Sequence, residues 1–105
     1  MAKKDSFILI YRKLLRGDKF RVIGYPAKFL FFLMKDSLFD DSNGHINTNE
    51  YFVKFGPLDA EACGMGKATY YRALRELLTA RIIDEVTCGG HGKRAIYDLS
   101  AWEWA

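Results

Sequence analysis

Cysteine and proline are scarce in this chain of 105 residues, which contains two of each. Two distant cysteines, Cys63 and Cys88, cannot build the dense disulfide framework of a small secreted scaffold. The longest apolar run, Phe29–Met34, is far shorter than the roughly 20 residues that a membrane-spanning helix needs. The residues after Met1 and Ala2 are charged and no apolar leader with a cleavage site follows them. We therefore expect a reduced, cytoplasmic protein with no membrane segment.

Acidic residues are also scarce near the N-terminus, where Asp5 and Asp18 alone oppose the basic residues of the first 24 positions. Those basic residues are Lys3, Lys4, Arg12, Lys13, Arg16, Lys19 and Arg21. The net charge is +3, half of the residues are hydrophobic and 15% are aromatic. This composition excludes a disordered chain and permits contact with nucleic acid. The length fits one domain over residues 1–105.

The first half of the chain predicts a strand-like run, a short basic helix and a long apolar helix. Phe7–Tyr11 is rich in β-formers, and Arg12–Phe20 fits a short basic helix. Pro26 suits the first turn of a helix over about 26–39, and its apolar residues on nearly every side predict a buried central helix. After a turn at 40–44, the loose alternation over 45–55 indicates a short strand or extended segment.

The second half carries the most informative pattern. A short helix over about 57–63 is expected to turn Leu58, Ala62 and Cys63 inward, and Gly64 and Gly66 supply a tight turn. A longer helix follows over about 67–80. Its apolar stripe has helical spacing and consists of Tyr70, Leu74, Leu77 and Leu78. Residues 83–99 then predict a β-hairpin with a glycine-rich, basic tip.

A helix, a tight turn, a second helix and a basic hairpin are, in this order, the parts of a winged helix-turn-helix. The predicted fold class is therefore α+β, with a three-helix core and a C-terminal β-hairpin wing. This architecture places one helix in the major groove of double-stranded DNA, and we expect the helix over 67–80 to have that role.

The chain also resembles the N-terminal winged-helix domain of replication initiator A proteins from bacterial plasmids and phages. The resemblance extends over about residues 7–99, and its most specific part is KATYYRALRELLTARIID, with Thr69, Arg72, Leu74 and Ile82 at matching positions. It implies DNA binding in replication initiation or in transcriptional regulation. The chain departs from the family pattern where Gly66 replaces the usual Ser or Thr cap, where Ala68 precedes Thr69 and where Arg81 replaces a glycine.

The predicted DNA-binding residues lie on the helix over 67–80 and on the hairpin tip. They are Lys67, Thr69, Tyr71, Arg72, Arg75, His91, Lys93 and Arg94. Arg72 is the predicted base reader, because a guanidinium bonds guanine O6 and N7 together. Lys67 and Thr69 are expected to hold phosphates, and the hairpin residues to contact the backbone or minor groove. The N-terminal cations Arg12, Lys13 and Arg16 would add non-specific phosphate contacts.

An alternative of a different class is a winged-helix module that binds a protein and not DNA. In this interpretation Arg72 and Arg75 are only solvated or paired with Glu76 or Thr79. Homodimer or partner contacts would then be made by aromatic residues, above all Trp102 and Trp104 at the end of the chain.

Metal binding and catalysis are not expected. The metal-ligating residue types, His45, Cys63, Cys88 and His91, include only one closely spaced pair, whereas structural zinc sites usually use two. No nucleophile has a base nearby in sequence. We predict no metal, no cofactor and no enzymatic activity.

Overall fold

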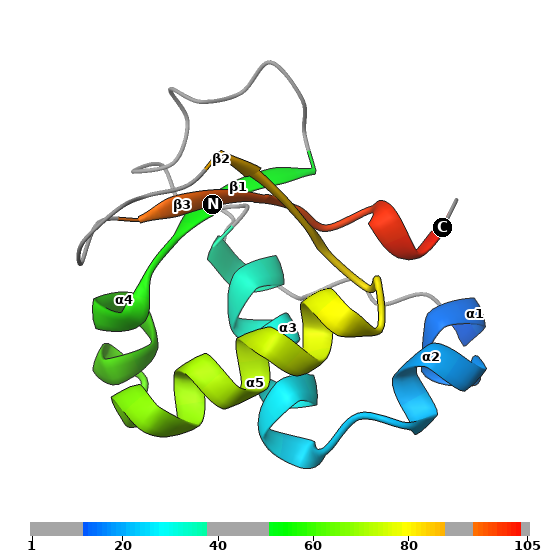
Figure 1. The fold of residues 1–105 in the computed structure, drawn as a ribbon, viewed down its shortest axis with the longest axis horizontal. Helices are drawn as coiled ribbons and strands as arrows, with labels where there is room; N and C mark the ends of the chain where they lie inside the picture. Colours follow the sequence, from blue (N-terminus) through cyan, green and yellow to red (C-terminus); the bar gives the residue numbers. More distant parts are fainter. Residues whose placement is uncertain (1–11, 38–50, 88–93, 104–105) are drawn as a thin grey trace, which may run out of the picture.

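The computed structural model describes residues 12–37, 51–87 and 94–103. These residues form two layers, with a three-stranded antiparallel sheet above and the helices below it in Figure 1. The mixed α+β class predicted from the sequence is confirmed. The runs over 7–11 and 38–50 lie outside the described residues.

The N-terminal basic region forms two short helices, α1 (Arg12–Leu15) and α2 (Asp18–Arg21). The prediction of one helix from Arg12 to Phe20 is wrong, because the chain leaves helical geometry at Gly17. The backbone of Gly17 is extended, with φ −81° and ψ 163°, and it begins the second helix.

Helix α3 (Tyr25–Ser37) has Pro26 in its first turn, where the missing N–H needs no partner. Its inner side lies in the core and consists of Ala27, Leu30, Phe31 and Met34. The expectation that this helix is buried all round is wrong, because Tyr25 and Phe29 on its outer side are exposed.

Helices α4 (Pro57–Ala62) and α5 (Lys67–Thr79) are joined by a tight turn. Gly64 has φ 92°, the left-handed region that favours glycine. The Met65 N–H donates to the Ala60 carbonyl at 3.0 Å, and the Gly64 N–H donates to the Glu61 carbonyl at 3.0 Å. These two bonds form a Schellman motif, which ends α4 and directs the buried Met65 into the core.

The inward side of α4 differs from the prediction. Leu58 is 71% exposed, and Ala62 and Cys63 are also exposed. Ala60 is the fully buried residue of this helix. The six residues of α4 make fewer than two turns, so the side that faces inward is set by the turn that docks Met65 and not by the apolar spacing.

Helix α5 buries one continuous stripe against the sheet and α3. The stripe contains Tyr70, Leu74 and Leu77, as the helical spacing predicted, together with Ala73. Leu78 is only half-buried. The helix ends in a second Schellman motif, in which the Ile82 N–H donates to the Leu77 carbonyl at 3.0 Å. Here Arg81 adopts the left-handed conformation, with φ 60°.

The sheet contains β1 (Phe52–Phe55), β2 (Asp84–Thr87) and β3 (Ala95–Asp98), in the order β1-β3-β2. The hairpin was expected to begin at residue 83, but Ile83 precedes β2 and is buried in the core, as is Ile82. The pairing of β2 with β3 is irregular between Glu85 and Thr87, where Val86 forms a bulge.

The sheet contacts α5 through aromatic residues. Phe55 and Tyr70 stack with ring centroids 6.2 Å apart and an interplanar angle of 28°. Burial raises the pKa of Tyr70 far above its ordinary value, and a side-chain hydrogen bond with Tyr97 of β3 raises it further. These contacts fix α5 against the sheet, so that its opposite side faces solvent.

Candidate nucleic-acid interface

The outward line of α5 contains Ala68, Arg72, Arg75 and Thr79, all of which are exposed. These residues are spaced by four, three and four positions, which places them on one side of a helix. The line lies opposite the buried stripe. It presents two long basic side chains between two small residues, and we name it the α5 outward line.

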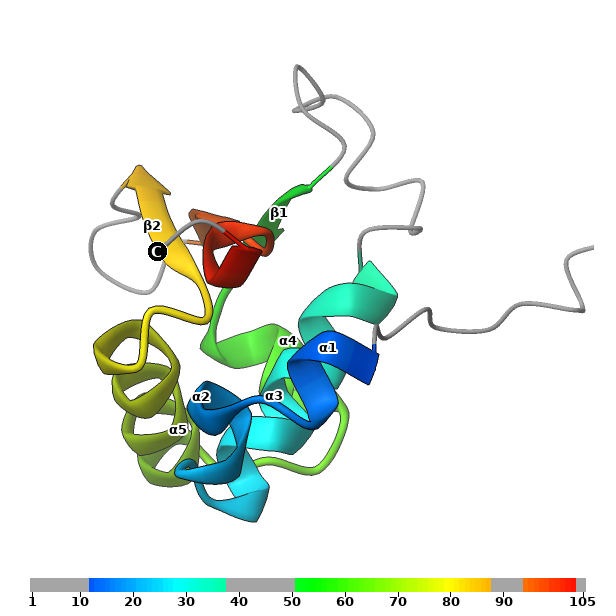
Figure 2. The same cartoon turned by 90° about the vertical axis from the view of Figure 1, so that its right-hand side faces the viewer.

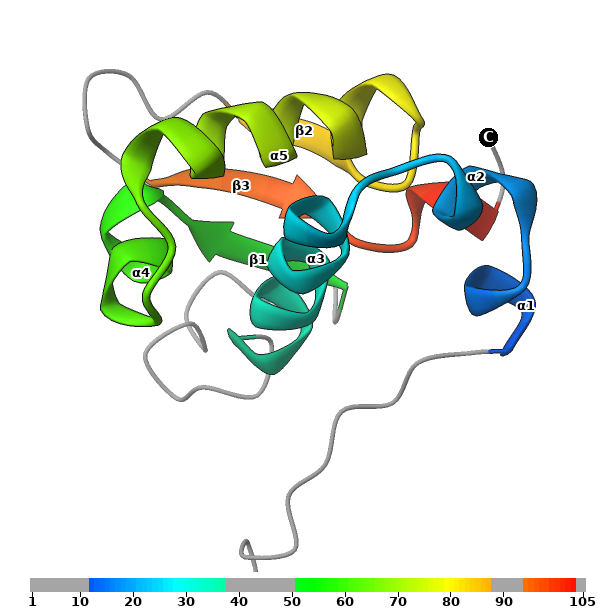
Figure 3. The same ribbon diagram turned by 90° about the horizontal axis from the view of Figure 1, so that it is seen from below.

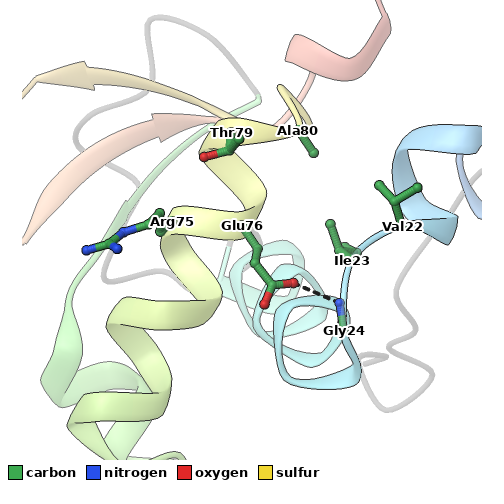
Figure 4. Close-up of a pocket in the computed structure, with 7 residues that line it drawn as sticks. All are labelled: Val22, Ile23, Gly24, Arg75, Glu76, Thr79 and Ala80. Atoms are coloured by element: carbon green, nitrogen blue, oxygen red, sulfur yellow. Dashed lines mark hydrogen bonds between the residues drawn. The ribbon is translucent and has the colours of Figure 1, made fainter.

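Arg72 and Arg75 make no ion pair with any of the residues described here. The alternative in which they pair with Glu76 is not observed, because the Glu76 carboxylate turns to another partner. Figure 4 shows Glu76 directed toward Gly24 while Arg75 points away from both. The guanidinium groups on the α5 outward line therefore have no carboxylate partner among the described residues.

The partner of Glu76 is the backbone at the beginning of α3. The Gly24 N–H donates to Glu76 Oε1 at 2.8 Å, across 52 residues of sequence. A carboxylate at this position satisfies an amide that the helix leaves unbonded and interacts favourably with the helix dipole. This bond ties α5 to α3.

The remaining predicted residues of α5 lie beside the α5 outward line. Lys67 is exposed at the first position of the helix, and Thr69 is half-buried. Tyr71 is 45% exposed and packs edge-to-face on Tyr70, with centroids 5.0 Å apart. Lys67 and Tyr71 can thus contact a ligand bound on the α5 outward line, whereas Thr69 offers less surface.

Arg94 has a partner that the sequence analysis missed. Its guanidinium donates to Asp59 Oδ1 at 3.2 Å, and the other Asp59 oxygen accepts the Gly56 N–H at 2.9 Å. A Cβ added at Gly56 would approach the Arg94 Cα to 3.3 Å, so the two backbones lie close together. The position of Asp59 in the first turn of α4 suggests a cap, but nothing in the sequence indicates a contact with a residue 35 positions away.

Strand β2, which leads to the predicted basic tip of the hairpin, is itself acidic. Asp84 and Glu85 are both exposed, as are the other two residues of the strand. His91 and Lys93, the remaining predicted contacts of the hairpin, lie outside the described residues. Of the predicted hairpin residues, the structure therefore describes only Arg94, and a carboxylate partly neutralises its charge.

The N-terminal cations lie away from α5. Arg12 and Lys13 are exposed on α1, and Arg16 follows that helix. In Figure 2, α2 lies between α1 and α5. These cations lie on or next to α1 and are not part of the α5 outward line.

A shallow groove adjoins Arg75. Its volume is about 640 Å³, and it separates the turn between α2 and α3 from the C-terminal half of α5 (Figure 4). The residues that line it are Val22, Ile23, Gly24, Arg75, Glu76, Thr79 and Ala80. The groove is open to solvent and holds Glu76 on its wall, so it is poorly suited to an anion.

Two other predictions concern the end of the chain and the cysteines. Trp102, in the short 3-10 helix η3 (Ala101–Glu103), is half-buried and packs against the core, and Trp104 lies outside the described residues. Cys63 is exposed, whereas the prediction placed it on the inward side of α4.

No group of three metal-ligating side chains is found within residues 12–37, 51–87 and 94–103.

Comparison of the chain with protein-family models, with curated proteins and with solved structures gives no match. Among the helices of the described segments, none has the length and apolar character required to cross a membrane.

Proposed function

We propose that this chain is a winged-helix domain that binds double-stranded DNA, with α5 as the helix that enters the major groove. The order α3, β1, α4, α5, β2, β3, with β1 paired to β3 and β2 at the edge, is compatible with this architecture. The resemblance to replication initiator A domains points to replication initiation or transcriptional regulation as the setting.

The observation that carries the proposal is the pair Arg72 and Arg75, exposed and without an ion pair among the described residues. The major groove of B-DNA is wide enough to admit an α-helix. A bidentate contact from Arg72 to a guanine would contribute about 1–3 kcal/mol of discrimination. Ala68 and Thr79 are small enough to allow close approach of the helix, and their methyl groups suit contact with thymine.

Arg94 has a secondary role in this proposal. A guanidinium has five N–H donors, so the bond to Asp59 leaves others for a phosphate oxygen. The acidic residues Asp84 and Glu85 would repel the DNA backbone, and β2 is therefore assigned no DNA contact. Binding then depends mainly on α5.

The test is fluorescence anisotropy with a labelled random-sequence duplex, titrated between about 50 and 200 mM salt. The variant Arg72→Ala/Arg75→Ala removes two charges from the α5 outward line. Arg12→Ala/Lys13→Ala removes the same charge from α1 and serves as the matched control. We expect the first variant to lower the slope of log affinity against log salt by up to about 2, and the control to change it much less.

Two results would overturn the proposal. The first is no binding by the wild-type protein at the lowest salt concentration. The second is an equal decrease of this slope in both variants, which would show that DNA is attracted to the basic protein in general and not to α5. Either result would favour a protein-binding module, an alternative supported by the strong exposure of Val22 and Leu58, at 75% and 71%.

A further inference from the structure

The outer side of α3 is an apolar face that no described residue covers. Tyr25 is 83% exposed and Phe29 is 45% exposed, one helical turn apart. Leu33 is half-buried one turn further on, and Asp36 is exposed at the end of the same line. We name these four residues the α3 outward line. Large aromatic side chains exposed at helical spacing indicate a contact surface for a protein.

The two ends of this line carry opposite charges. The ammonium of Lys28 lies 5.2 Å from the centre of the Tyr25 ring and 5.7 Å from that of Phe20 in α2, so it sits at the α2 edge of the apolar face, near the N-terminus of α3. Asp36 carries a carboxylate near the C-terminus. Neither residue forms an ion pair with another described residue. An apolar centre with one cation and one anion at its ends is complementary to itself when turned by 180°.

We propose that a second copy of this chain binds the α3 outward line, so that the two α3 helices pack antiparallel about a two-fold axis. With the axis between Phe29 and Leu33, Phe29 of each copy lies beside Leu33 of the other. Lys28 then lies only about 3 Å along the helix axis from Asp36 of the second copy, at a rise of 1.5 Å per residue. Both ion pairs of the symmetric dimer form on the same side of the helices.

The area of this face predicts a weak dimer. At roughly 200 Å² for an aromatic side chain, the exposed parts of Tyr25 and Phe29 amount to roughly 250 Å² on each copy. With the neighbouring Pro26 and Leu33 the total stays below the roughly 1,200 Å² of a stable interface. The free protein therefore associates reversibly at high concentration.

A duplex with two half-sites would stabilise this dimer, a step that rests on the proposed function. The α3 outward line and the α5 outward line lie on different helices and share no residue. The described body measures 35 × 33 × 27 Å. The centres of two such bodies placed side by side are separated by about one body width, which is close to one turn of DNA, about 34–36 Å.

The experiment is sedimentation equilibrium of the protein without DNA, from ~10 µM to ~1 mM, a range that detects weak association. We expect the wild type to pass from monomer to dimer and Phe29→Glu to remain monomeric. Leu58→Glu is the matched control, because it introduces the same charge at an exposed apolar residue of α4. Lys28→Glu and Asp36→Lys should each weaken the dimer, and the double variant should restore it, a recovery that general unfolding cannot produce.

A wild type that stays monomeric throughout overturns the inference, and so does a charge-swapped variant that fails to recover. If Leu58→Glu and Phe29→Glu weaken the dimer equally, the contact does not depend on the α3 outward line, and the inference is overturned as well. Binding of a single-site duplex separates this inference from the proposed function. Phe29→Glu should bind such a duplex as Leu58→Glu does, whatever its oligomeric state.

Discussion

Helices α3 and α5 are each 13 residues long and cross one another in the helical layer (Figure 3), yet they present different surfaces to solvent. The α5 outward line carries two arginines between small residues. The α3 outward line carries Tyr25, Phe29 and Leu33, with Asp36 at its end. The inner sides of both helices contribute apolar residues to the same core.

The difference shows that core packing accounts for the residue types on the inner side of each helix but not for those on the outer side. Packing requires Leu30 and Leu77, which are both fully buried, but it does not require arginine on one outer side or tyrosine on the other. Aromatic residues exposed to water gain nothing for the fold, and arginines without partners add little to stability. We therefore interpret the two outer surfaces as contact sites of different chemistry.

The largest effect is expected from a substitution in the core that α3 and α5 share. Leu77→Ala should destabilise the protein by about 2–5 kcal/mol, because Leu77 is completely buried and its truncation would leave a cavity in the core. Arg75→Ala, two residues earlier, should change the unfolding free energy by about 0.5 kcal/mol or less. Urea denaturation followed by circular dichroism measures both. Similar losses for the two variants would contradict the division of α5 into an inner and an outer side.

The next effect concerns the bond that joins the two helices. Glu76→Ala removes the acceptor of the Gly24 N–H, and we expect a loss of about 1 kcal/mol in unfolding free energy. Glu76→Gln keeps an oxygen acceptor and should lose less. Because both variants remove a negative charge beside Arg72 and Arg75, both should bind DNA more tightly at low salt. A loss of DNA binding in Glu76→Gln would mean that the carboxylate itself contributes to recognition.

A gain in stability is expected at the end of α5. Arg81 has φ 60°, a conformation that glycine adopts without strain. Arg81→Gly should therefore raise the unfolding free energy by about 0.5–1 kcal/mol, which thermal denaturation can detect. The same variant removes a cation at the end of α5 but outside the α5 outward line, so specific DNA affinity should change little. A specific affinity that falls as far as in Arg72→Ala would extend the interface to the end of the helix.

The smallest effect is expected at Lys35 on α3, which is 9% exposed. Burial lowers the pKa of Lys35 below its ordinary value of 10.5, and nearby Glu103 offsets part of this shift. The folded protein thus releases this proton at lower pH than the unfolded chain does. The buried charge therefore lowers the unfolding free energy most near neutral pH, and this destabilisation disappears as pH rises toward 10.5. Lys35→Met should be slightly more stable than the wild type near neutral pH, by about 0.5 kcal/mol.

The measurement for Lys35 is the difference in unfolding free energy between Lys35→Met and the wild type, taken near neutral pH and again above pH 10.5. Taking a difference cancels the other groups that titrate over this range. The advantage of the variant should shrink at the higher pH. An advantage that grows with pH would show that the ammonium is stabilised in the folded protein.

Helical spacing predicted the inner side of α5 correctly, because 13 residues span more than three turns and the period is well defined. The same approach failed for α4, where Leu58 and Cys63 are exposed, because six residues define no period. For α3 the composition was too apolar to distinguish an inner from an outer side. Only the placement of its neighbours in the fold makes that distinction.

The candidate site was predictable in part. The exposure of Arg72 and Arg75 follows from the period of α5, and the structure agrees. The pairing of Arg94 with Asp59 and the bond from Gly24 to Glu76 join residues 35 and 52 positions apart. Such contacts depend on how the helices dock on the sheet, and no local pattern in one sequence records that arrangement.

The irregular edge at β2 has a consequence for aggregation. An exposed edge strand can recruit strands from other molecules and begin the growth of fibrils. The bulge at Val86 interrupts the row of backbone groups that a new strand would need, and the carboxylates of Asp84 and Glu85 would repel a second copy aligned there. Addition of a strand at the β2 edge should therefore be disfavoured even in concentrated solutions.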